Sequence, residues 1–274
     1  MTNPIRFPTA LLALTSLALL SGQAASAAQT CPAYTDTIET PDLPHFTAAL
    51  EPNANLSILV IGTAPSSSPE QMIAAIAALP RAKPGSPAPL PPQPPTEAPS
   101  YFPAAMAHAL QNTARGLKIT LDIRGKHGQD AATQLQTLRA ILTSSKKYQL
   151  VIWQTGTTDA VRDIGAEDFY QNLADGAALV QQSGADLILV EPQFSRFLTA
   201  QANLPPYLDA MQTIGAEPGV MVFHRYDIMH DWADAAAIDL EAAPPKDRPA
   251  VASHLQTCLG LELAHEILSA AKGR

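Results

Sequence analysis

Polar residues follow the ends of two apolar segments of this chain. The run 148–154 leads into Gly156–Asp159, and a second run, Leu56–Ile61, stops at Gly62. Such β-branched runs are typical of buried parallel strands, and open α/β sheets bind ligands beyond the carboxyl ends of their strands. The serine cluster Ser66–Ser68 adds hydroxyl groups just beyond Gly62. We therefore predict a single site that is shared between the loops of one sheet.

Apolar segments with strand and helix character alternate along the chain, which predicts βαβ units and a parallel sheet. The predicted strands are Leu56–Ile61, Leu117–Arg124, Tyr148–Gln154, Asp186–Val190 and Gly219–Tyr226. The predicted helices are Pro69–Leu79, Pro103–Thr113, Asp130–Thr143, Ala166–Gln182, Tyr207–Ile214 and Leu259–Ala271. The segment Pro80–Pro103 is too rich in proline for a helix or a central strand, so we predict an extended loop there. A flap over the site or a docking segment is the alternative for this loop.

The first 27 residues have the pattern of a secretory signal peptide. Arg6 precedes the apolar run Ala10–Leu20, and Ala25-Ser26-Ala27 offers a cleavage site of the A-x-A type. The mature chain would then be a single α/β domain, 28–274, with no transmembrane segment. This predicts a periplasmic or secreted protein.

The net charge and the cysteine content narrow the class of protein further. A net charge of −8 over 274 residues argues against nucleic acid as a partner. The two cysteines, Cys31 and Cys258, are an even number in a chain predicted to be exported, which favours a disulfide between them. No spacing of His, Cys, Asp and Glu indicates a metal site, and we predict none.

Four segments, in order, resemble the motifs of the SGNH/GDSL hydrolase family. Ile58–Ala64 resembles the strand and GDS motif of the nucleophilic serine, and Ile123–Gly125 the motif whose glycine donates an N–H to the oxyanion. Gly156–Asp159 resembles the GxND motif, and His254 the histidine of the final DxxH motif, which a closing helix follows. The resemblance implies a three-layer αβα sandwich with a mostly parallel, flavodoxin-like sheet. It also implies an esterase without a cofactor.

The chain departs from the family at three catalytic positions. Ala64 stands at the nucleophile position, Thr158 at the asparagine position, and Val251 at the aspartate position. Alanine has no nucleophilic oxygen, and valine cannot orient an imidazole. Only Gly125 and His254 match the catalytic pattern.

A relocated catalytic group would restore the chemistry. Ser66 can replace the missing nucleophile, although a Ser-Ser-Ser-Pro-Glu string is also typical of a helix N-cap. Asp247 and Asp239 lie upstream of His254 and can replace the missing acid, but solvated loop charges are the alternative for both.

Two functions remain open from the sequence, and so does the question of whether the protein is an enzyme. The first is an exported esterase of acyl or acetyl esters, including esters on carbohydrates, with His254, Ser66, Gly125 and Thr158 as catalytic candidates. The second is a non-catalytic module of the cell envelope that binds a glycan or a partner protein. The predicted binding residues are Gly62, Thr63, Ala64, Gly156 and Asp159.

A few further residues lie near the predicted strand ends. Glu191 can contact a ligand hydroxyl or cap a loop, and His127 can line the pocket or lie on the surface. We predict packing and surface hydrogen bonds for His224 and His230, and a core position for Trp153.

Overall fold

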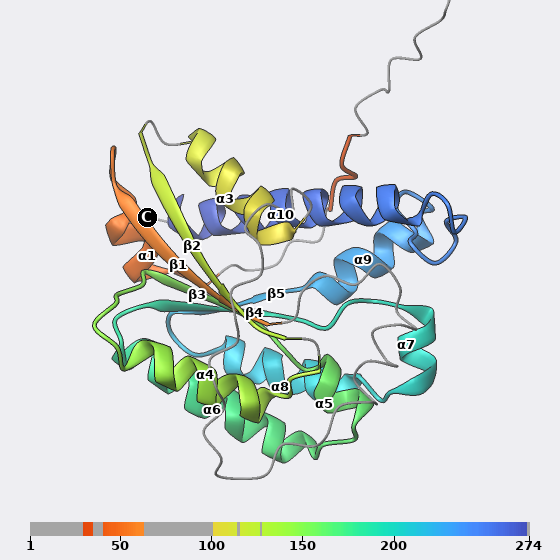
Figure 1. Ribbon diagram of the computed structural model, residues 1–274, viewed down its shortest axis with the longest axis horizontal. Coiled ribbons are helices and arrows are strands. Elements are labelled where there is room, and N and C mark those ends of the chain that lie inside the picture. Colours follow the sequence, from red (N-terminus) through yellow and green to blue (C-terminus); the bar gives the residue numbers. More distant parts are fainter. Residues whose placement is uncertain (1–29, 35–40, 63–100, 114–115, 127, 273–274) are drawn as a thin grey trace, which may run out of the picture. The chain divides into compact units, whose positions relative to one another are not determined.

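Five parallel strands form the centre of the compact unit Cys31–Arg274 (Figure 1). The structure, a computed structural model, describes residues 30–34, 41–62, 101–113, 116–126 and 128–272. The strands are β1 (Asn55–Ile61), β2 (Lys118–Arg124), β3 (Leu150–Gln154), β4 (Asp186–Val190) and β5 (Val220–Phe223). Their order is β2-β1-β3-β4-β5. The chain thus changes direction across the sheet between β2 and β3, which makes the carboxyl ends of β1 and β3 the switch point where such sheets bind ligands.

Helices cover both faces of this sheet (Figure 1). One face packs against α1 (Pro44–Ala49), α3 (Phe102–Thr113), α9 (Arg225–Asp234) and α10 (Arg248–Lys272). The other packs against α4 (Ala131–Leu142), α5 (Thr157–Val161), α6 (Ala166–Gln182), α7 (Arg196–Gln201) and α8 (Pro205–Gly215). These layers confirm the predicted αβα sandwich with a parallel, flavodoxin-like sheet.

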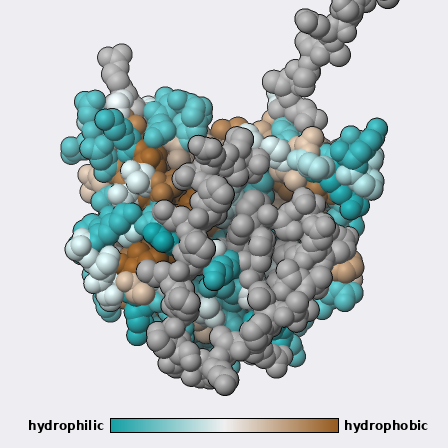
Figure 2. Space-filling model, in the orientation of Figure 1, coloured by the Kyte–Doolittle hydropathy of each residue, from teal (hydrophilic) through white to brown (hydrophobic). Residues whose placement is uncertain are grey.

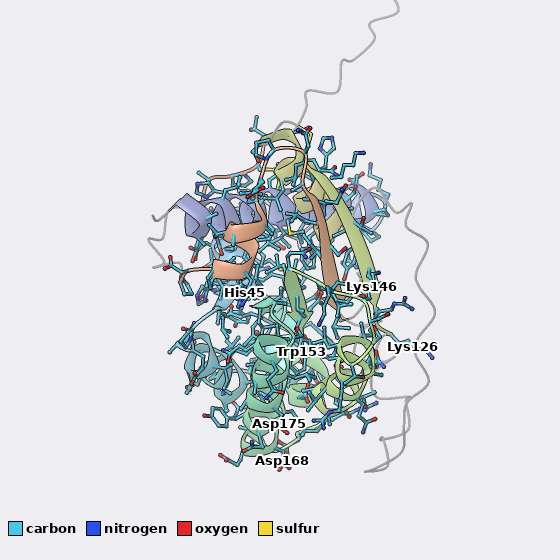
Figure 3. All side chains as sticks on the ribbon, turned by 90° about the vertical axis from the view of Figure 1, so that its left-hand side faces the viewer. His45, Lys126, Lys146, Trp153, Asp168 and Asp175 are labelled. Carbon is cyan, nitrogen blue, oxygen red and sulfur yellow. A yellow bond between two sulfur atoms is a disulfide. The ribbon has the colours of Figure 1, made fainter. Side chains whose placement is uncertain are left out.

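Alternation along each strand divides the apolar core between the two faces. Ile58 and Val60 of β1 join the cluster under α3 and α10, whereas Leu59 and Ile61 join the cluster over α4 and α6. Successive side chains of a strand point to opposite faces, so an unbroken apolar run is what a strand covered on both sides requires. Trp153 is completely buried, which confirms its predicted core position (Figure 3).

The edge strand β2 differs from the four strands beside it. Its first four residues alternate between exposed and half-buried positions and only Asp122 is buried, whereas β3, β4 and β5 are buried throughout. In Figure 2, apolar surface is visible among hydrophilic residues on the side of the view where β2 lies in Figure 1. The polar side chains of β2 are therefore partly accessible to solvent, unlike those of the buried strands β3, β4 and β5.

Side-chain caps explain where several helices begin. The Asp130 carboxylate accepts a hydrogen bond from the Thr133 N–H at 2.9 Å, and the Ser195 hydroxyl accepts one from the Leu198 N–H at 3.0 Å. Each cap satisfies one of the amide groups that the first turn of a helix leaves unpaired. Pro205 lies in the first turn of α8, where a missing N–H costs nothing.

The structure corrects the predicted boundaries at two places. Strand β5 ends at Phe223 instead of Tyr226, because the His224 carbonyl already accepts from the Ile228 N–H and begins α9. The last helix begins at Arg248 instead of Leu259, with Pro249 in its first turn. Gly260 lies inside this helix because a Cβ there would lie 2.4 Å from the Phe102 carbonyl oxygen of α3.

Four short helices were not predicted, namely α1, α5, α7 and α9. The predicted proline-rich loop ends earlier than Pro103, which lies in the first turn of α3. The rest of that loop and the predicted helix Pro69–Leu79 lie outside the described residues. Within the described ranges, no helix is both long enough and apolar enough to cross a membrane.

Candidate functional site

Glycines bring the carboxyl ends of β1, β2 and β3 into close contact. The Gly62 N–H donates to the Arg124 carbonyl at 3.0 Å, and a Cβ on Gly125 would lie 1.3 Å from the Gly62 carbonyl oxygen. A Cβ on Gly62, whose φ is 151°, would lie 2.7 Å from the Cβ of Gln154. No side chain fits at either glycine, so the structure brings these two predicted residues together as a backbone junction.

A small pocket lies beside this junction, where β3 ends. It is lined by Gln129, Gln134, Gln154, Thr155, Gly156, Thr157 and Thr158. The glutamines were missed by the sequence prediction, although Gln154 is the last residue of a predicted strand. The described lining consists of amide groups, hydroxyl groups and backbone, which are hydrogen-bonding groups that do not titrate near neutral pH.

Two lining residues define what the pocket offers a ligand. The Gln134 amide oxygen accepts from the Trp153 indole N–H at 2.7 Å, so the core fixes the direction of that amide. The Thr155 hydroxyl is buried and has no hydrogen-bond partner within the described part of the chain. A buried polar atom without a partner is uncommon in folded proteins, and a ligand is one way to satisfy it.

Gly156 sets the direction in which the chain leaves β3. It has a φ of 91°, and it begins α5, which carries Thr158 and Asp159. Thr158 is one of the residues that line the pocket. The Asp159 carboxylate instead accepts from the Ala131 N–H, with oxygen distances of 3.0 and 3.3 Å. Asp159 thus fastens α5 to the start of α4.

Burial changes the titration of Asp159. The residue is 1% exposed, and burial raises the pKa of its carboxyl to about 7, with a smaller contribution from the Asp130 charge. The hydrogen bond from Ala131 acts in the opposite direction. Asp159 therefore holds a proton over part of the neutral range even though it lies one residue from the pocket lining.

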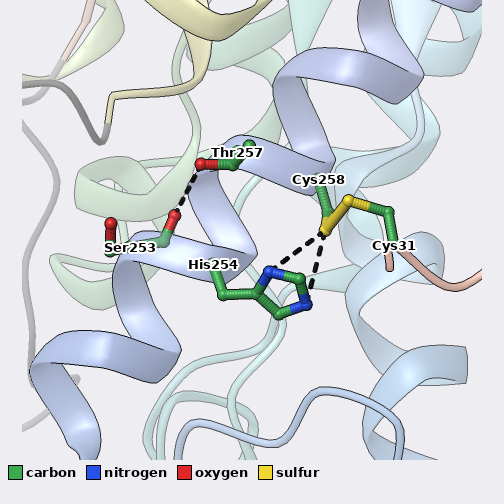
Figure 4. Close-up of a disulfide and its surroundings, with 5 residues drawn as sticks. All are labelled: Cys31, Ser253, His254, Thr257 and Cys258. Carbon is green, nitrogen blue, oxygen red and sulfur yellow. Dashed lines mark hydrogen bonds between the residues drawn. A yellow bond between two sulfur atoms is a disulfide. The ribbon is translucent and has the colours of Figure 1, made fainter. Parts of the chain in front are cut away.

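His254 lies inside α10 beside the disulfide between Cys31 and Cys258 (Figure 4). The disulfide confirms the predicted cysteine pair. Each ring nitrogen of His254 lies 3.7 Å from the Cys258 Sγ, one helical turn away. Within the described ranges, its imidazole has no carboxylate partner. The expectation that His254 precedes the closing helix was wrong, because the helix begins at Arg248.

The residues considered as replacement acids are engaged elsewhere or carry no contact with His254. Asp239 forms an ion pair with Arg196 at 2.9 Å and accepts from the N–H groups of Glu241 and Ala242. Asp247 accepts from the Val251 N–H through its backbone carbonyl. Val251 itself packs against the apolar core. Thr63, Ala64, Ser66 and the side chain of His127 lie outside the described residues.

A second group of polar residues occupies the ends of β4 and β5. The His224 Nδ1 lies 3.1 Å from the Glu191 Oε1, and the other Glu191 oxygen accepts from the Tyr226 N–H at 3.3 Å. Glu191 and His224 also lie near Asp227 in a cluster that could hold a metal ion. Glu191 thus holds together β4, β5 and the start of α9. His224 is a buried packing residue, as predicted, and the exposure of His230 agrees with its predicted surface role.

Two buried ionisable residues of this region were not singled out from the sequence. Arg225 is 3% exposed, and burial lowers the pKa of its guanidinium to about 10. Glu266 of α10 is 7% exposed, and burial, followed by the charges of Glu262 and Glu191, raises the pKa of its carboxyl to about 8. Nothing in the local sequence indicated their burial, because it depends on the packing of α9 and α10 against the sheet.

The fold and the strand-end motifs define a protein of the SGNH/GDSL hydrolase type. The sequence matches the non-GDSL lipase-like family over residues 29–273, and the chain belongs to this family. No curated protein has significant sequence similarity to the chain.

Two solved structures illustrate the likeness of the fold. A putative lipolytic protein of the G-D-S-L family from Desulfitobacterium hafniense is 14% identical, with a TM-score of 0.50, over 77% of this chain and 99% of that one. A variant of an acetyl-xylooligosaccharide esterase from Geobacillus is also 14% identical, with a TM-score of 0.50, over 82% of this chain and 97% of that one. At these identities the likeness concerns the fold.

Proposed function

We propose that this protein binds an ester-bearing carbohydrate in the pocket at the end of β3, and that it does not hydrolyse the ester by the serine route. The observation that supports this most directly is the pocket lining of glutamine amides, threonine hydroxyls and backbone. Sugars present neutral hydroxyl groups that both donate and accept, which such a lining can match. The buried Thr155 hydroxyl offers one hydrogen bond that has no described protein partner.

The surroundings of His254 support the absence of serine chemistry. Hydrolysis by this route needs a base that is oriented and charge-stabilised by an acid, a nucleophile within about 3 Å of that base, and donors for the oxyanion. The His254 imidazole lies against the disulfide sulfur, and Val251 stands where the family has its acid. Ala64 stands at the nucleophile position. The triad of the resembled family would therefore lack both its nucleophile and its acid.

A second candidate is an acyl or acetyl esterase in which Ser66 replaces the missing nucleophile. It is favoured by the close contact of Gly62 and Gly125, because the resemblance gives Gly125 the role of a backbone donor to the oxyanion. Ser66 Oγ would attack the ester carbonyl while His254 accepts its proton, and the alcohol would leave with that proton. Water would then release the acid from the acyl-serine and regenerate the hydroxyl.

An active-site probe separates the two candidates. The purified protein is treated with a fluorophosphonate, digested, and mapped by mass spectrometry, and turnover of p-nitrophenyl acetate is measured in parallel. We expect no labelled serine and no turnover above that of the His254→Ala and Ser66→Ala variants. A label on Ser66 that the Ser66→Ala variant loses would establish the esterase instead.

Binding is tested directly with acetylated xylo-oligosaccharides, by titration calorimetry or by NMR shift mapping. We expect saturable binding that the Gln154→Ala variant weakens, and shifts confined to the ends of β1, β2 and β3. The exposed Gln181, on α6 away from the pocket lining, provides the matched control as Gln181→Ala. NMR shifts centred on other residues would show that the carbohydrate binds outside the pocket. Absence of binding would refute the proposal.

We also propose that the protein is exported and consists of one domain after a signal peptide. The sequence 1–27 and the disulfide support this, because disulfides persist mainly in oxidising compartments. Expression with the native leader in a bacterial host, followed by intact mass measurement, tests it. The expected mass is that of a chain beginning at Ala28 with the disulfide formed, and a retained leader would contradict it.

A further inference from the structure

A basic strip runs along the open edge of this acidic protein. The stretch 116–148 contains Lys118, Arg124, Lys126, Arg139, Lys146 and Lys147, whereas its only acids are Asp122 and Asp130. The chain as a whole carries a net charge of −8. Positive charge is therefore concentrated on β2, on the turn after it, and on the loop that leads into β3.

Strand alternation places part of this charge on one face of β2. Ile119, Leu121 and Ile123 pack against the core under α3 and α10, so Lys118, Asp122 and Arg124 lie on the opposite face. We use the name basic strip for Lys118, Arg124, Lys126, Lys146 and Lys147. Figure 3 shows the labelled Lys126 and Lys146 on the same side of the molecule.

The one acid within the strip is already neutralised. Asp122 accepts from Arg124 Nε at 2.7 Å, from Lys146 Nζ at 2.8 Å and from the Tyr148 hydroxyl at 2.7 Å. Burial acts to raise the pKa of this carboxyl, but these hydrogen bonds hold it well below its usual range. Two cations share one carboxylate, so this cluster carries net positive charge near neutral pH.

The remaining lysines of the strip are open to a ligand. Lys118, Lys126 and Lys147 are exposed, and none of them forms an ion pair with another described residue. Lys118 and Arg124 are six residue steps apart on β2, so the strip is about 20 Å long on this strand alone. This length suits a chain of several sugar units better than a single small anion.

The basic strip leads into the candidate site. Lys126 follows Gly125 of the glycine junction, and its backbone N–H donates to the Gln129 amide oxygen at 2.9 Å. Gln129 in turn lines the pocket at the end of β3. One end of the strip is therefore joined to the neutral, hydrogen-bonding pocket by a direct contact.

We propose that the basic strip binds an anionic polysaccharide, such as a chain of uronic acids, and directs it into the pocket. This rests on the proposed carbohydrate-binding function and names the class of the carbohydrate. Spaced carboxylates on the ligand would meet the lysines, while its hydroxyl groups would meet the glutamines and threonines. The exposed large apolar residues of the described structure, Phe197 and Leu261, lie on α7 and α10 instead of beside the strip, which disfavours a membrane surface.

The experiment compares two probes and two kinds of variant. Binding of oligogalacturonate and of neutral acetylated xylo-oligosaccharides of equal length is measured by calorimetry at low and at high salt. The strip is altered singly and jointly as Lys118→Glu, Lys126→Glu and Lys147→Glu. The control is Lys246→Glu, which makes the same change of net charge at an exposed residue outside the strip. Circular dichroism confirms the fold of each variant.

We expect tighter binding of oligogalacturonate than of the neutral oligosaccharide, and a Kd that rises with salt because exposed charges are screened. Each single strip variant should weaken oligogalacturonate binding by up to about fivefold, the range of an exposed ion pair, and the triple variant by more. The Lys246→Glu variant should resemble the parent, and neutral binding should change little.

Three outcomes would overturn the inference. Equal affinity for the two probes, without salt dependence, would refute the role of the strip while leaving the pocket function intact. Duplex DNA or phosphatidylglycerol vesicles could instead bind in a way that depends on the strip, while oligogalacturonate does not bind. The partner of the strip would then not be a polysaccharide. Failure of both oligosaccharides to bind would refute the proposed function as well.

Discussion

The two halves of the carboxyl edge of the sheet carry different kinds of residue. Gly62 and Gly125, which follow β1 and β2, form a backbone junction, and neutral polar residues at the end of β3 line a small pocket. Strands β4 and β5 end in Glu191 and His224, and the buried Arg225 follows directly. The described pocket lining thus has no side chain that titrates near neutral pH, whereas Glu191 and His224 at the ends of β4 and β5 are paired with other protein groups.

This difference shows that titratable residues at strand ends do not by themselves mark a catalytic site. A buried carboxylate needs hydrogen bonds or a counter-charge, and Glu191 obtains them from His224 and the Tyr226 backbone. The half with the glycine junction contains, within the described residues, the pocket in which we propose that a ligand binds. Variants that affect one half and spare the other can test this division.

Loss of the disulfide should have the largest effect, and it concerns the half around α10. Cys31 and Cys258 are separated by 227 residues in the sequence. In the chain-entropy estimate, a loop of this length contributes about 5 kcal/mol to the free energy of unfolding. We expect the Cys31→Ser/Cys258→Ser variant to lose much of its stability in urea unfolding. A midpoint equal to that of the oxidised parent would contradict this expectation.

Substitution of Gly125 should have the next largest effect on stability, and it concerns the glycine junction beside the pocket. An added Cβ would meet the Gly62 carbonyl oxygen at 1.3 Å, so β1 and β2 would have to move apart. We expect Gly125→Ala to cost about 3 kcal/mol or more of unfolding free energy and to weaken carbohydrate binding. Gly165→Ala is the control, because an added Cβ there would lie 3.7 Å from its nearest neighbour, the Asp168 carboxylate. Equal stability of the two variants would show that the junction adapts easily.

The pH dependence of the free energy of unfolding should reveal the titration of Glu266, which belongs to the half of the molecule around α9 and α10. Because the folded-state pKa of Glu266, about 8, exceeds its ordinary value of 4.5, this carboxyl favours folding most at low pH. Stability is lost as pH rises from 4.5 towards 8. We expect Glu266→Gln to be more stable than the parent at pH 9, by on the order of 1 kcal/mol or more, with the advantage vanishing near pH 5. Thermal unfolding at both pH values measures it, with the exposed Glu217→Gln as control. A constant difference between parent and variant would exclude the titration of Glu266.

The smallest effect on stability is expected for Thr155→Val. The buried hydroxyl has no described protein partner, so its removal should change the free energy of unfolding by less than about 1 kcal/mol. If a ligand uses this hydroxyl, carbohydrate affinity should fall about threefold to tenfold, as for one neutral hydrogen bond. An unchanged Kd would exclude Thr155 from the binding contacts.

Much of the fold was predictable because the informative signals are local. Strand β4 agrees with its predicted bounds, and α6 does too, since an unbroken apolar run and an amphipathic period are properties of consecutive residues. The short helices were missed because they have too few turns for a period to emerge. The start of α10 at Arg248 was missed, although Pro249 suits the first turn of a helix.

The candidate site was predictable only in part. The glycines at Gly62, Gly125 and Gly156 were found because each ends or follows a recognisable strand. The contact between Asp159 and the start of α4 was not, and neither was the convergence of Gln129 and Gln154 on one pocket. These residues come from separate segments, and no local pattern indicates which segments meet.

By itself, the sequence determined the class of fold, the strand ends that meet at one edge of the sheet, and the cysteine pair. Backbone pattern and residue identity carry this information without any knowledge of neighbours. Only the tertiary structure decided the environment of His254, the pairing of Glu191 with His224, and the connection of the basic strip to the pocket. Burial, charge pairing and hydrogen bonding depend on which distant segments pack together, and that is a property of the folded chain.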